Sequence, residues 1–413
     1  MKVLYISYDG ATEPIAKSQI VPYLERLTNK GVSCTLLSFD KKRYIPRRMQ
    51  FDYVKSEFQE KAIHWISLRY HKTPTALATG WDILCGIAVS LYVCIKERIN
   101  IVHARSYVAA LIALCVKVLC RKKFIFDMRG YWADERVEGY LWPEHSLLYK
   151  IAKRLEKVFV CQADFIVVLT KNMQSRLSQD YKIAPERIAV IPTCVDLEKF
   201  HIVPPDTAED SLFGSVKQRL ENKAVLIYVG SLGTVYMLEA MFDFFALLKA
   251  RVEKMHFLLL SHSDTQAAYA AAEQKAIPED EFTLISSAHD SVRTWLNLAK
   301  IGIAFYRPAF SAIGRAPTKI GEYLACGIPV VVNKGVGDID QIVVERNIGV
   351  VVDSLDEPGY LKAAAALERL IEQPDLKERC RRVAQEYFSL EKGSDDYFKV
   401  YQTVMNQKSG KRN

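Results

Sequence analysis

The stretch PTKIGEYLACGIPVVVNKGVGDID, residues 317–340, decides the fold of the second half of the chain. Its beginning predicts a helix over residues 318–326, with Pro317 in the preceding turn and Thr318 as the capping residue. The turn at Gly327 then leads into the apolar run 329–332, which predicts a buried strand. A helix, a short turn and a wholly apolar strand are typical of a parallel sheet covered by helices.

The same alternation of apolar runs and amphipathic stretches extends over both halves of the chain. In the first half it predicts strands at residues 3–7, 34–38, 99–103, 124–127, 165–169 and 189–191. In the second half it predicts strands at residues 225–229, 257–261, 283–285, 301–305, 329–332 and 349–352. We therefore expect an α/β protein with two Rossmann-like domains that face each other across a cleft, where a ligand would bind.

Polar, proline-containing sequence around HIVPPDTAEDS, residues 201–211, separates the two halves. It predicts a linker over residues 197–222, between an N-terminal domain at 1–196 and a second domain at 223–385. The C-terminal segment 386–413 follows as a separate piece of helical sequence. The helix expected after the first strand covers residues 18–29, with Ser18 as its N-cap.

Composition limits the class of protein. Half of the 413 residues are apolar and a quarter are charged, as in globular proteins, and the formal net charge is +8. That charge fits an anionic substrate, anionic lipid or simply a basic surface. The nine cysteines form no CxxC pair, so we expect no zinc site and a reducing compartment. Without a signal-peptide pattern or a run of about 18 uncharged apolar residues, we expect a cytoplasmic protein that does not span a membrane.

The start of the helix at 318–326 carries the strongest candidate site. Lys319 lies in the first turn, where a cation is unfavourable for the helix dipole. That placement makes sense if Lys319 meets a diphosphate held at the start of the helix. Glu322 lies three residues further on, on nearly the same face, where its carboxylate could accept hydrogen bonds from a ribose. The alternative is a capped helix with a weak surface pair of Lys319 and Glu322.

This segment resembles the nucleotide-sugar signature of family 4 glycosyltransferases of the GT-B fold, in which an E-x7-E motif precedes A-C-G-x-P-V-V. Glu322 matches the second glutamate, to which the resemblance assigns the donor ribose. The first glutamate, which contacts the donor sugar in the family, would fall on Gly314 and is absent. The resemblance therefore leaves Arg315 and Lys319 to compensate by charge.

Residues 228–241, YVGSLGTVYMLEAM, are similar to the phosphate-binding loop V-G-R-L…K-G of the same family. Gly230 and Gly233 permit a tight turn with close backbone approach to a ligand. Ser231 stands at the arginine position, and no lysine follows nearby. Without the resemblance this is a generic strand-to-helix turn. Neutralisation of the phosphates is expected from three basic residues elsewhere in this half: Lys319, Arg315 and Arg307.

Residues 124–142, FIFDMRGYWADERVEGYLW, place charged and aromatic side chains directly after a predicted strand. Arg129-Gly130 occupies the position of a His-Gly pair in many family 4 members. We expect acceptor recognition here, with Arg129 and Asp127 near the reacting centre; a charged surface loop is the alternative. His103, in the HARSY segment 103–107, is a candidate catalytic base, and it also fits an ordinary buried histidine.

The resemblance covers nearly the whole chain, and it implies that segment 386–413 is a helix crossing back to the first domain. It implies a transferase that moves a sugar, with retention, from a nucleoside-diphosphate sugar to a glycan or lipid-linked acceptor in cell-surface polysaccharide synthesis. No metal, other cofactor or nucleic-acid partner is expected. Stretches 81–96 and 107–120 could lie on the inner face of a membrane or be core helices. A sugar-nucleotide epimerase and a non-catalytic GT-B binding subunit are the alternatives.

Overall fold

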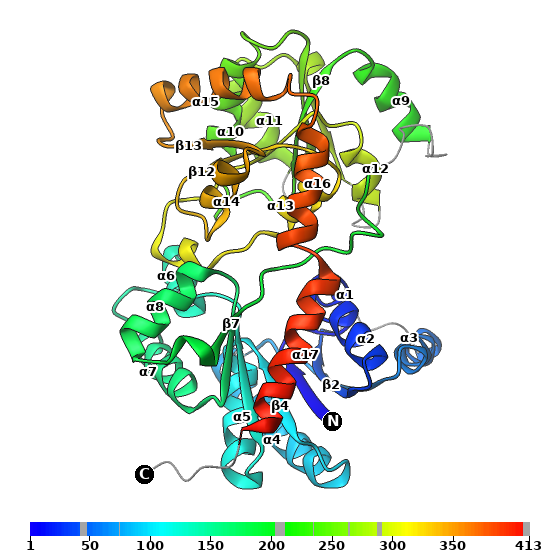
Figure 1. Ribbon diagram of the computed structural model, residues 1–413, viewed down its shortest axis with the longest axis vertical. Helices are drawn as coiled ribbons and strands as arrows, with labels where there is room; N and C mark the ends of the chain where they lie inside the picture. The colour runs from blue at the N-terminus through cyan, green and yellow to red at the C-terminus, as the bar shows by residue number, and fades with distance from the viewer. Residues whose placement is uncertain are drawn as a thin grey trace. The chain divides into compact units, whose positions relative to one another are not determined.

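The computed structural model of the chain describes residues 1–41, 48–73, 75–202, 211–233, 235–262, 265–286 and 291–407. Their contacts divide the chain into two compact units, which Figure 1 shows coloured along the chain. The first unit comprises Met1–Pro192 and Leu390–Asn413, and the second comprises Thr193–Ser389. These divisions lie a few residues from the expected positions 196 and 386.

The first unit is built on a seven-stranded parallel sheet. Its strands, in spatial order, are β3 (Ile63–Arg69), β2 (Ser33–Asp40), β1 (Lys2–Ser7), β4 (Ile101–Arg105), β5 (Lys123–Met128), β6 (Phe165–Val168) and β7 (Ile188–Val190). The central strands are almost completely buried because helices cover both faces, which explains their continuous apolar sequences. The order reverses between β1 and β4, and in such sheets ligands bind beyond the carboxyl ends of the strands at this point.

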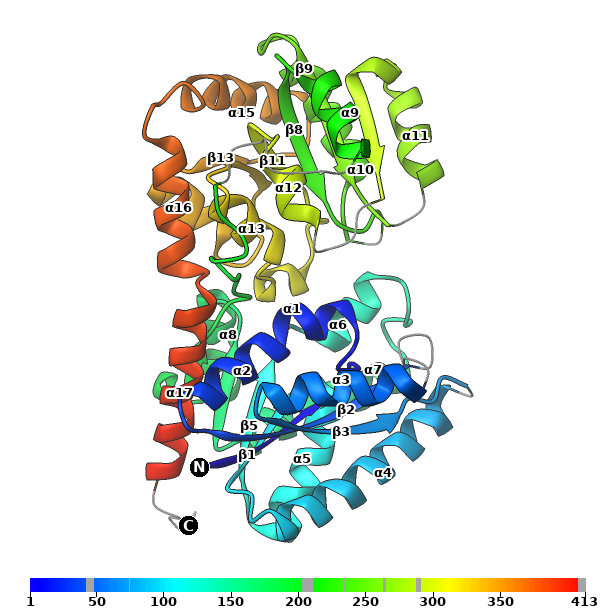
Figure 2. The same cartoon turned by 90° about the vertical axis from the view of Figure 1, so that its right-hand side faces the viewer.

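The helices of the first unit lie on the two faces of this sheet. They are α1 (Pro14–Gln19), α2 (Val21–Asn29), α3 (Arg48–Glu60), α4 (Thr75–Lys96), α5 (Ser106–Cys120), α6 (Trp132–Glu138), α7 (Leu147–Gln162), α8 (Lys171–Tyr181) and the C-terminal α17 (Leu390–Asn406). Figure 2 shows α2 and α3 on one side of β1, β2 and β3, and α4 and α5 on the other. The last helix, α17, packs against α2, so the end of the chain belongs to the N-terminal unit.

The second unit repeats this architecture with a six-stranded parallel sheet. Its strand order is β10 (Phe282–Ile285), β9 (Met255–Leu260), β8 (Ala224–Val229), β11 (Ile301–Ala304), β12 (Val330–Asn333) and β13 (Gly349–Val352). The helices are α9 (Ser211–Leu220), α10 (Leu238–Leu248), α11 (Thr265–Gln274), α12 (Val292–Leu296), α13 (Thr318–Ala325), α14 (Ile339–Arg346), α15 (Glu357–Leu370) and α16 (Leu376–Tyr387). A core of buried aromatic side chains, including Phe242, Phe245 and Phe257, fills the space between sheet and helices.

Two expected helix caps are wrong. Ser18 lies inside α1, where its hydroxyl donates to the carbonyl of Pro14 at 3.0 Å. The helical hydrogen bonding is interrupted at Ile20, and α2 begins at Val21. Pro22 fits the first turn of α2 because a residue there needs no N–H group for a helical hydrogen bond. At α13 the position before the helix is Pro317, which offers no side-chain cap, and Thr318 is already the first helical residue.

The expected linker over residues 197–222 is also wrong in part. The described residues 211–220 form α9, which buries Phe213 beside Trp295, with ring centroids 5.1 Å apart. At the other end, the Arg381 guanidinium on α16 donates to the carbonyl of Leu197 at 2.8 Å. Both ends are therefore parts of the second unit, and the linker prediction for residues 203–210 lies outside the described residues.

Among the described residues, one helical stretch, Leu77–Lys96 of α4, is long and apolar enough to cross a membrane by length and composition alone. Its single acidic residue, Asp82, is buried and accepts hydrogen bonds from the Tyr8 hydroxyl at 2.9 Å and the His71 amide at 3.0 Å. These bonds fix the inner side of α4 on the first unit. A buried carboxylate with several donors is typical of a helix that belongs to a folded core.

Candidate functional site

The candidate donor site of the second unit lies beyond the carboxyl ends of β8 and β11, where the strand order reverses. The turn after β8 contains Gly230, Ser231 and Gly233, and the chain after β11 contributes Tyr306 and Arg307. An antiparallel bridge between Tyr236 and Tyr306 joins these two segments. The position matches the place where open parallel sheets bind ligands.

The Lys319 side chain, on the first turn of α13, lies inside a cluster of tyrosines at this edge of the sheet. Its ammonium nitrogen is 4.1 Å from the ring centroid of Tyr228, 3.9 Å from that of Tyr236 and 5.9 Å from that of Tyr306. Only 7% of Lys319 is exposed, and within the described residues its Nζ atom has no hydrogen-bond partner. Aromatic faces attract a cation but accept no strong hydrogen bond, so the ammonium retains its donors for another group.

Gly230 makes room for this lysine. A Cβ atom at position 230 would lie 2.7 Å from Lys319 Nζ, and the glycine has φ +137°, a conformation that other residues rarely adopt. The turn after β8 therefore needs glycine for two reasons. The sequence identified Gly230 as a close-approach position, and the group that approaches it in the structure is the Lys319 side chain.

Burial changes the ionisation of both charged residues on α13. It holds the pKa of the Lys319 ammonium well below its usual 10.5, although nearby Glu322 opposes this change. It also raises the pKa of the Glu322 carboxyl to about 7, against the charges of Lys319 and Lys199. Two buried ionisable groups with displaced pKa values at the ligand edge of a sheet are typical of a functional site.

The other predicted donor-side residues lie around this cluster with different exposure. Arg315 follows the short helix Phe310–Gly314 and donates to the Ser311 hydroxyl at 2.9 Å. Ser231 is exposed, and its carbonyl accepts a hydrogen bond from the Tyr228 hydroxyl at 2.6 Å. Gly314, at the position of the missing family glutamate, is buried and supplies no carboxylate.

Sequence reasoning missed the aromatic part of this site. Tyr228 lies one residue before the end of β8 and Tyr306 two residues beyond the end of β11, so both belong to the carboxyl ends of neighbouring strands. Asn333 at the end of β12 was also missed; its side-chain oxygen accepts from the Tyr306 amide at 2.7 Å and its side-chain nitrogen donates to the Tyr306 carbonyl at 2.9 Å. Tyrosines near the carboxyl ends of adjacent strands were the available signal.

In the first unit, Asp127 at the end of β5 lies in a closed polar cluster beneath α17. The Tyr397 hydroxyl donates to one Asp127 oxygen at 3.0 Å, and His103 Nε2 is 3.5 Å from the same oxygen. The other His103 nitrogen is 2.8 Å from the Tyr401 hydroxyl, and Arg129 forms an ion pair with Asp127 at 3.6 Å. Neither Asp127 nor His103 has any exposed surface.

The charges of this cluster balance one another. Burial favours the neutral carboxyl, but the Arg129 guanidinium, with His103 and Arg105, holds the pKa of Asp127 at about 2. Burial likewise lowers the pKa of His103, against the attraction of Asp127. The expected place of Asp127 beside an acceptor, and the expected base role of His103, do not fit their complete burial. Both side chains instead bind the C-terminal helix to the sheet.

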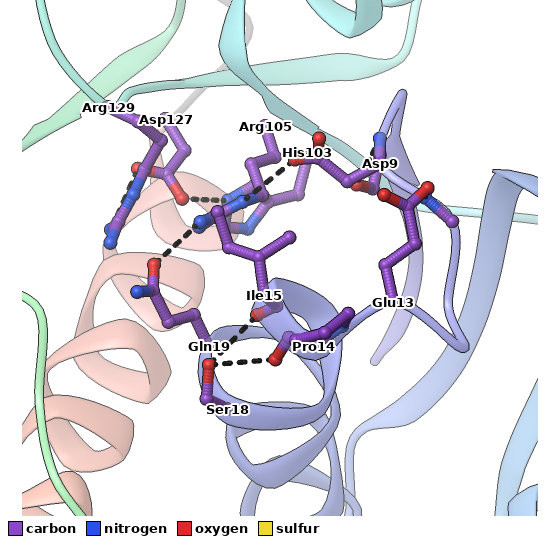
Figure 3. Close-up of polar contacts among 12 residues, drawn as sticks. Asp9, Glu13, Pro14, Ile15, Ser18, Gln19, His103, Arg105, Asp127 and Arg129 are labelled. Atoms are coloured by element: carbon purple, nitrogen blue, oxygen red, sulfur yellow. Dashed lines mark hydrogen bonds and ion pairs between the residues drawn. The ribbon is translucent and has the colours of Figure 1, made fainter. Parts of the chain in front are cut away.

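A second polar group lies at the switch point of the first unit, shown in Figure 3. Arg105, at the end of β4, donates to the Gln19 side chain at 2.9 Å and lies 3.9 Å from Asp9, which follows β1. Glu13 accepts a hydrogen bond from the Gly10 amide at 3.0 Å. Of the two residues predicted for the acceptor, only Arg129 keeps some exposed side-chain surface, 11%. Arg105 and Asp9 were not predicted.

Among the described residues, no group of three or more histidine, cysteine, aspartate or glutamate side chains is placed to hold a metal ion. All nine cysteines are free, and five of them are buried.

Two family profiles match the sequence. Residues 23–199 match "Glycosyltransferase Family 4", and residues 314–393 match "Glucosyltransferase 3-like, C-terminal domain". No curated protein sequence matches the chain significantly. The second match begins at Gly314 and includes Lys319 and Glu322.

Solved structures of glycosyltransferases match over nearly the full length. A glycosyltransferase from Rickettsia africae ESF-5 is 14% identical, with a TM-score of 0.71, covering 98% of this chain and 99% of that one. Anabaena HepE, solved with UDP and glucose, is 13% identical, with a TM-score of 0.68 and coverage of 98% and 100%. An E. coli structure described as trehalose-6-phosphate bound with UDP-2-fluoro glucose is 12% identical, with a TM-score of 0.68 and coverage of 99% and 100%.

The two switch-point sheets, the glycosyltransferase profiles on both units and these full-length likenesses agree. The chain is a glycosyltransferase of the GT-B fold whose residues 23–199 match the family 4 glycosyltransferase model.

Proposed function

We propose that this glycosyltransferase takes its sugar from a uridine-diphosphate donor at the tyrosine-lined site of the second unit. Lys319 carries the proposal, because its buried ammonium has no hydrogen-bond partner among the described residues. A diphosphate would supply the missing acceptors and the missing negative charge. The Anabaena neighbour was solved with UDP and glucose, which supports uridine as the base.

In this proposal Lys319 and Arg315 bind the diphosphate, and Glu322 binds the donor ribose. The backbone at Gly230, Ser231 and Gly233 approaches the phosphates. These cations and the amide groups at the start of α13 stabilise the departing diphosphate, so the proposal includes no metal ion. Transfer proceeds with retention, as the family resemblance implies.

On the acceptor side, we propose a glycan or lipid-linked acceptor at the carboxyl edge of the first sheet. Arg129 and Arg105 supply cationic groups there, and Arg105 lies beside Asp9 and Gln19. The product would belong to a cell-surface polysaccharide, made on the cytoplasmic side by a protein that contacts the membrane peripherally.

The donor half of the proposal is tested by thermal shift with UDP, GDP and ADP and their glucose conjugates, in the presence of a chelator. We expect a clear rise in melting temperature with the uridine compounds, because ligand that binds only the native state stabilises it. Equal stabilisation by all three bases, or none, would contradict the donor assignment.

The transfer reaction is tested by product analysis with the stabilising UDP-sugar and membrane lipid extract as acceptor source. A glycosylated lipid or glycan together with free UDP supports transfer. An altered sugar still attached to UDP would instead identify an epimerase. Donor binding without any turnover would favour a non-catalytic subunit, for which Gly314, in place of the family glutamate, is the specific observation.

A further inference from the structure

The segment from the end of α6 through α7 exposes an unusual amount of apolar side chain. Its exposed residues are Tyr140 (84%), Leu141 (62%), Leu147 (72%), Leu148, Ile151 and Val158. Isolated exposed apolar residues are normal on a protein surface, but several of them along one segment of the chain indicate an interaction site. We call these six residues the α6–α7 apolar face.

The first part of this face is held outward by the cap of α6. The Leu141 amide donates to the Arg136 carbonyl at 2.8 Å and the Tyr140 amide to the Val137 carbonyl at 2.9 Å, which closes the helix end. Tyr140 occupies the left-handed position of this cap with φ +58°, where glycine is usual. Trp142 turns back and packs on Trp132, with ring centroids 4.9 Å apart. The loop is thus fixed with Tyr140 and Leu141 in solvent.

The second part lies on α7, which has three distinct sides. Its inner side is anchored by Lys153, which pairs with Asp134 at 2.8 Å, and by Glu156, which accepts from the Tyr107 hydroxyl at 2.6 Å. Its outer side carries Leu147, Ile151 and Val158 at helical spacing. A third side, next to this apolar stripe, carries three cations: Lys150, Arg154 and Lys157.

An apolar stripe beside a row of cations is the arrangement of helices that lie in a lipid–water interface. The apolar side chains enter the acyl boundary, while lysine and arginine contact anionic head groups. None of the three cations has an ion pair in the part of the chain that is described, so their charges are available to lipid.

The stretches favoured by the sequence for membrane contact fit this chemistry less well. The outer side of α4 is apolar over Leu77, Trp81, Leu84, Tyr92 and Ile95, but it has no cation before Lys96 at its end. Six of the 15 residues of α5 are buried, and its strongly exposed apolar side chains are limited to Val118 and Leu119 at its end. Charge complementarity along the stripe therefore distinguishes α7 from α4.

We propose that the α6–α7 apolar face docks on an anionic lipid bilayer. α6 and α7 pack against each other and follow Arg129 and the carboxyl end of β5 along the chain; Figure 1 shows both helices in the first unit. Docking there brings the acceptor edge of the first sheet to the membrane surface. The inference rests on the proposed lipid-linked acceptor for its purpose, but the docking is measurable without any acceptor.

Flotation with vesicles of phosphatidylglycerol and phosphatidylcholine tests the docking, with pure phosphatidylcholine vesicles as reference. We expect the full chain to float with the anionic vesicles and to be released at about 0.5 M salt. The triple variant Leu147→Ser/Leu148→Ser/Ile151→Ser and the charge variant Lys150→Gln/Arg154→Gln/Lys157→Gln should each lower the bound fraction about 10-fold. The matched control, Trp81→Ser/Leu84→Ser/Tyr92→Ser on α4, should float like the unmodified chain.

Several results would overturn the proposal. The first is that the unmodified chain does not float, and the second is that only the α4 variant loses flotation. The third is that analytical ultracentrifugation shows a dimer that the α7 variants dissociate. Melting temperature and UDP binding of each variant are measured in parallel to establish that it folds. An unmodified chain that binds UDP but does not float rejects the docking alone, whereas one that floats but does not bind UDP rejects the donor site alone.

Discussion

Both units bury a charge near the carboxyl edge of their sheet, but the surroundings of the two charges differ. In the first unit, one Asp127 oxygen has the Tyr397 hydroxyl and His103 as partners, and the other has no hydrogen bond in the described part of the chain but forms an ion pair with Arg129 at 3.6 Å. In the second unit, the Lys319 ammonium lies against tyrosine rings and has no hydrogen-bond partner within the described residues. A buried charge paired with an opposite charge stabilises the fold, while one that lies against aromatic rings at a ligand edge lowers stability and remains available to a ligand.

Among the variants that change donor binding, Lys319→Met should have the largest effect. Removal of the ammonium should weaken UDP binding about 100-fold, because hydrogen bonds to a charged group are lost. The same change should raise the melting temperature of the ligand-free protein, because a buried cation is replaced by an apolar side chain that fits between the rings. Isothermal titration and thermal melting measure the two effects.

Lys362→Met is the matched control, because Lys362 is an exposed lysine of the same unit whose partner Asp353 is also exposed. It should leave both measurements unchanged. A Lys319→Met protein that binds UDP normally would remove the diphosphate assignment.

The counterpart in the first unit is Asp127→Asn, which should act on stability instead. It removes the negative charge of Asp127 that pairs with Arg129, and we expect a loss of about 3 kcal/mol in the free energy of unfolding. Urea denaturation measures this loss, and UDP affinity should not change. If Asp127→Asn abolished transfer while the free energy of unfolding stayed the same, Asp127 would be catalytic and the comparison between the units would fail.

Gly230→Ala should give an intermediate effect of about 2 kcal/mol on stability, because the backbone there has φ +137° and a new methyl group would meet Lys319. UDP affinity should fall too, since Lys319 must shift. Gly214→Ala on α9, where a Cβ atom would meet nothing, is the control and should not destabilise the protein. Equal melting temperatures for the two variants would show that the turn after β8 is not constrained.

The smallest expected effect separates the ring of Tyr236 from its hydroxyl. Tyr236→Phe retains the aromatic face and should change UDP affinity by less than about 2-fold. Tyr236→Leu removes one cation–π contact, and we expect a loss of about 1 kcal/mol in the free energy of UDP binding. The tyrosine rings act on the donor only by positioning the Lys319 ammonium. Tyr236→Leu should therefore have no effect on UDP affinity in a protein that already carries Lys319→Met. Additive losses in that double variant would assign Tyr236 a direct contact with the donor.

Much of the fold could be predicted from the sequence because buried parallel strands appear as short apolar runs. The strand β3 was missed, since its sequence IHWISLR mixes polar and apolar residues, and α9 was taken for linker because its buried residues follow a polar stretch. In the donor site, Lys319 and Gly230 were identified separately, and their contact depends on the turn after β8 and the start of α13 meeting in space.

The cluster around Asp127 could not be predicted in this way. Its partner Tyr397 lies 270 residues away along the chain, on a helix that packs in the first unit only because the chain returns to it. From the sequence, a charged residue after a strand looks the same whether it faces a ligand or a distant helix. Only the burial of Asp127 and the contacts of its carboxylate distinguish the two.

The central claim is that the buried Lys319, whose ammonium pKa is lowered by burial, binds the donor diphosphate. A bound diphosphate should raise the lowered pKa of the Lys319 ammonium, so UDP binding should take up protons from solution. Titration calorimetry with UDP at about pH 8, in two buffers of different ionisation enthalpy, measures this uptake directly. The account predicts net proton uptake by the unmodified protein and its loss in Lys319→Arg, whose guanidinium is always charged. UDP binding without proton uptake, or with the same uptake in Lys319→Arg, would contradict it.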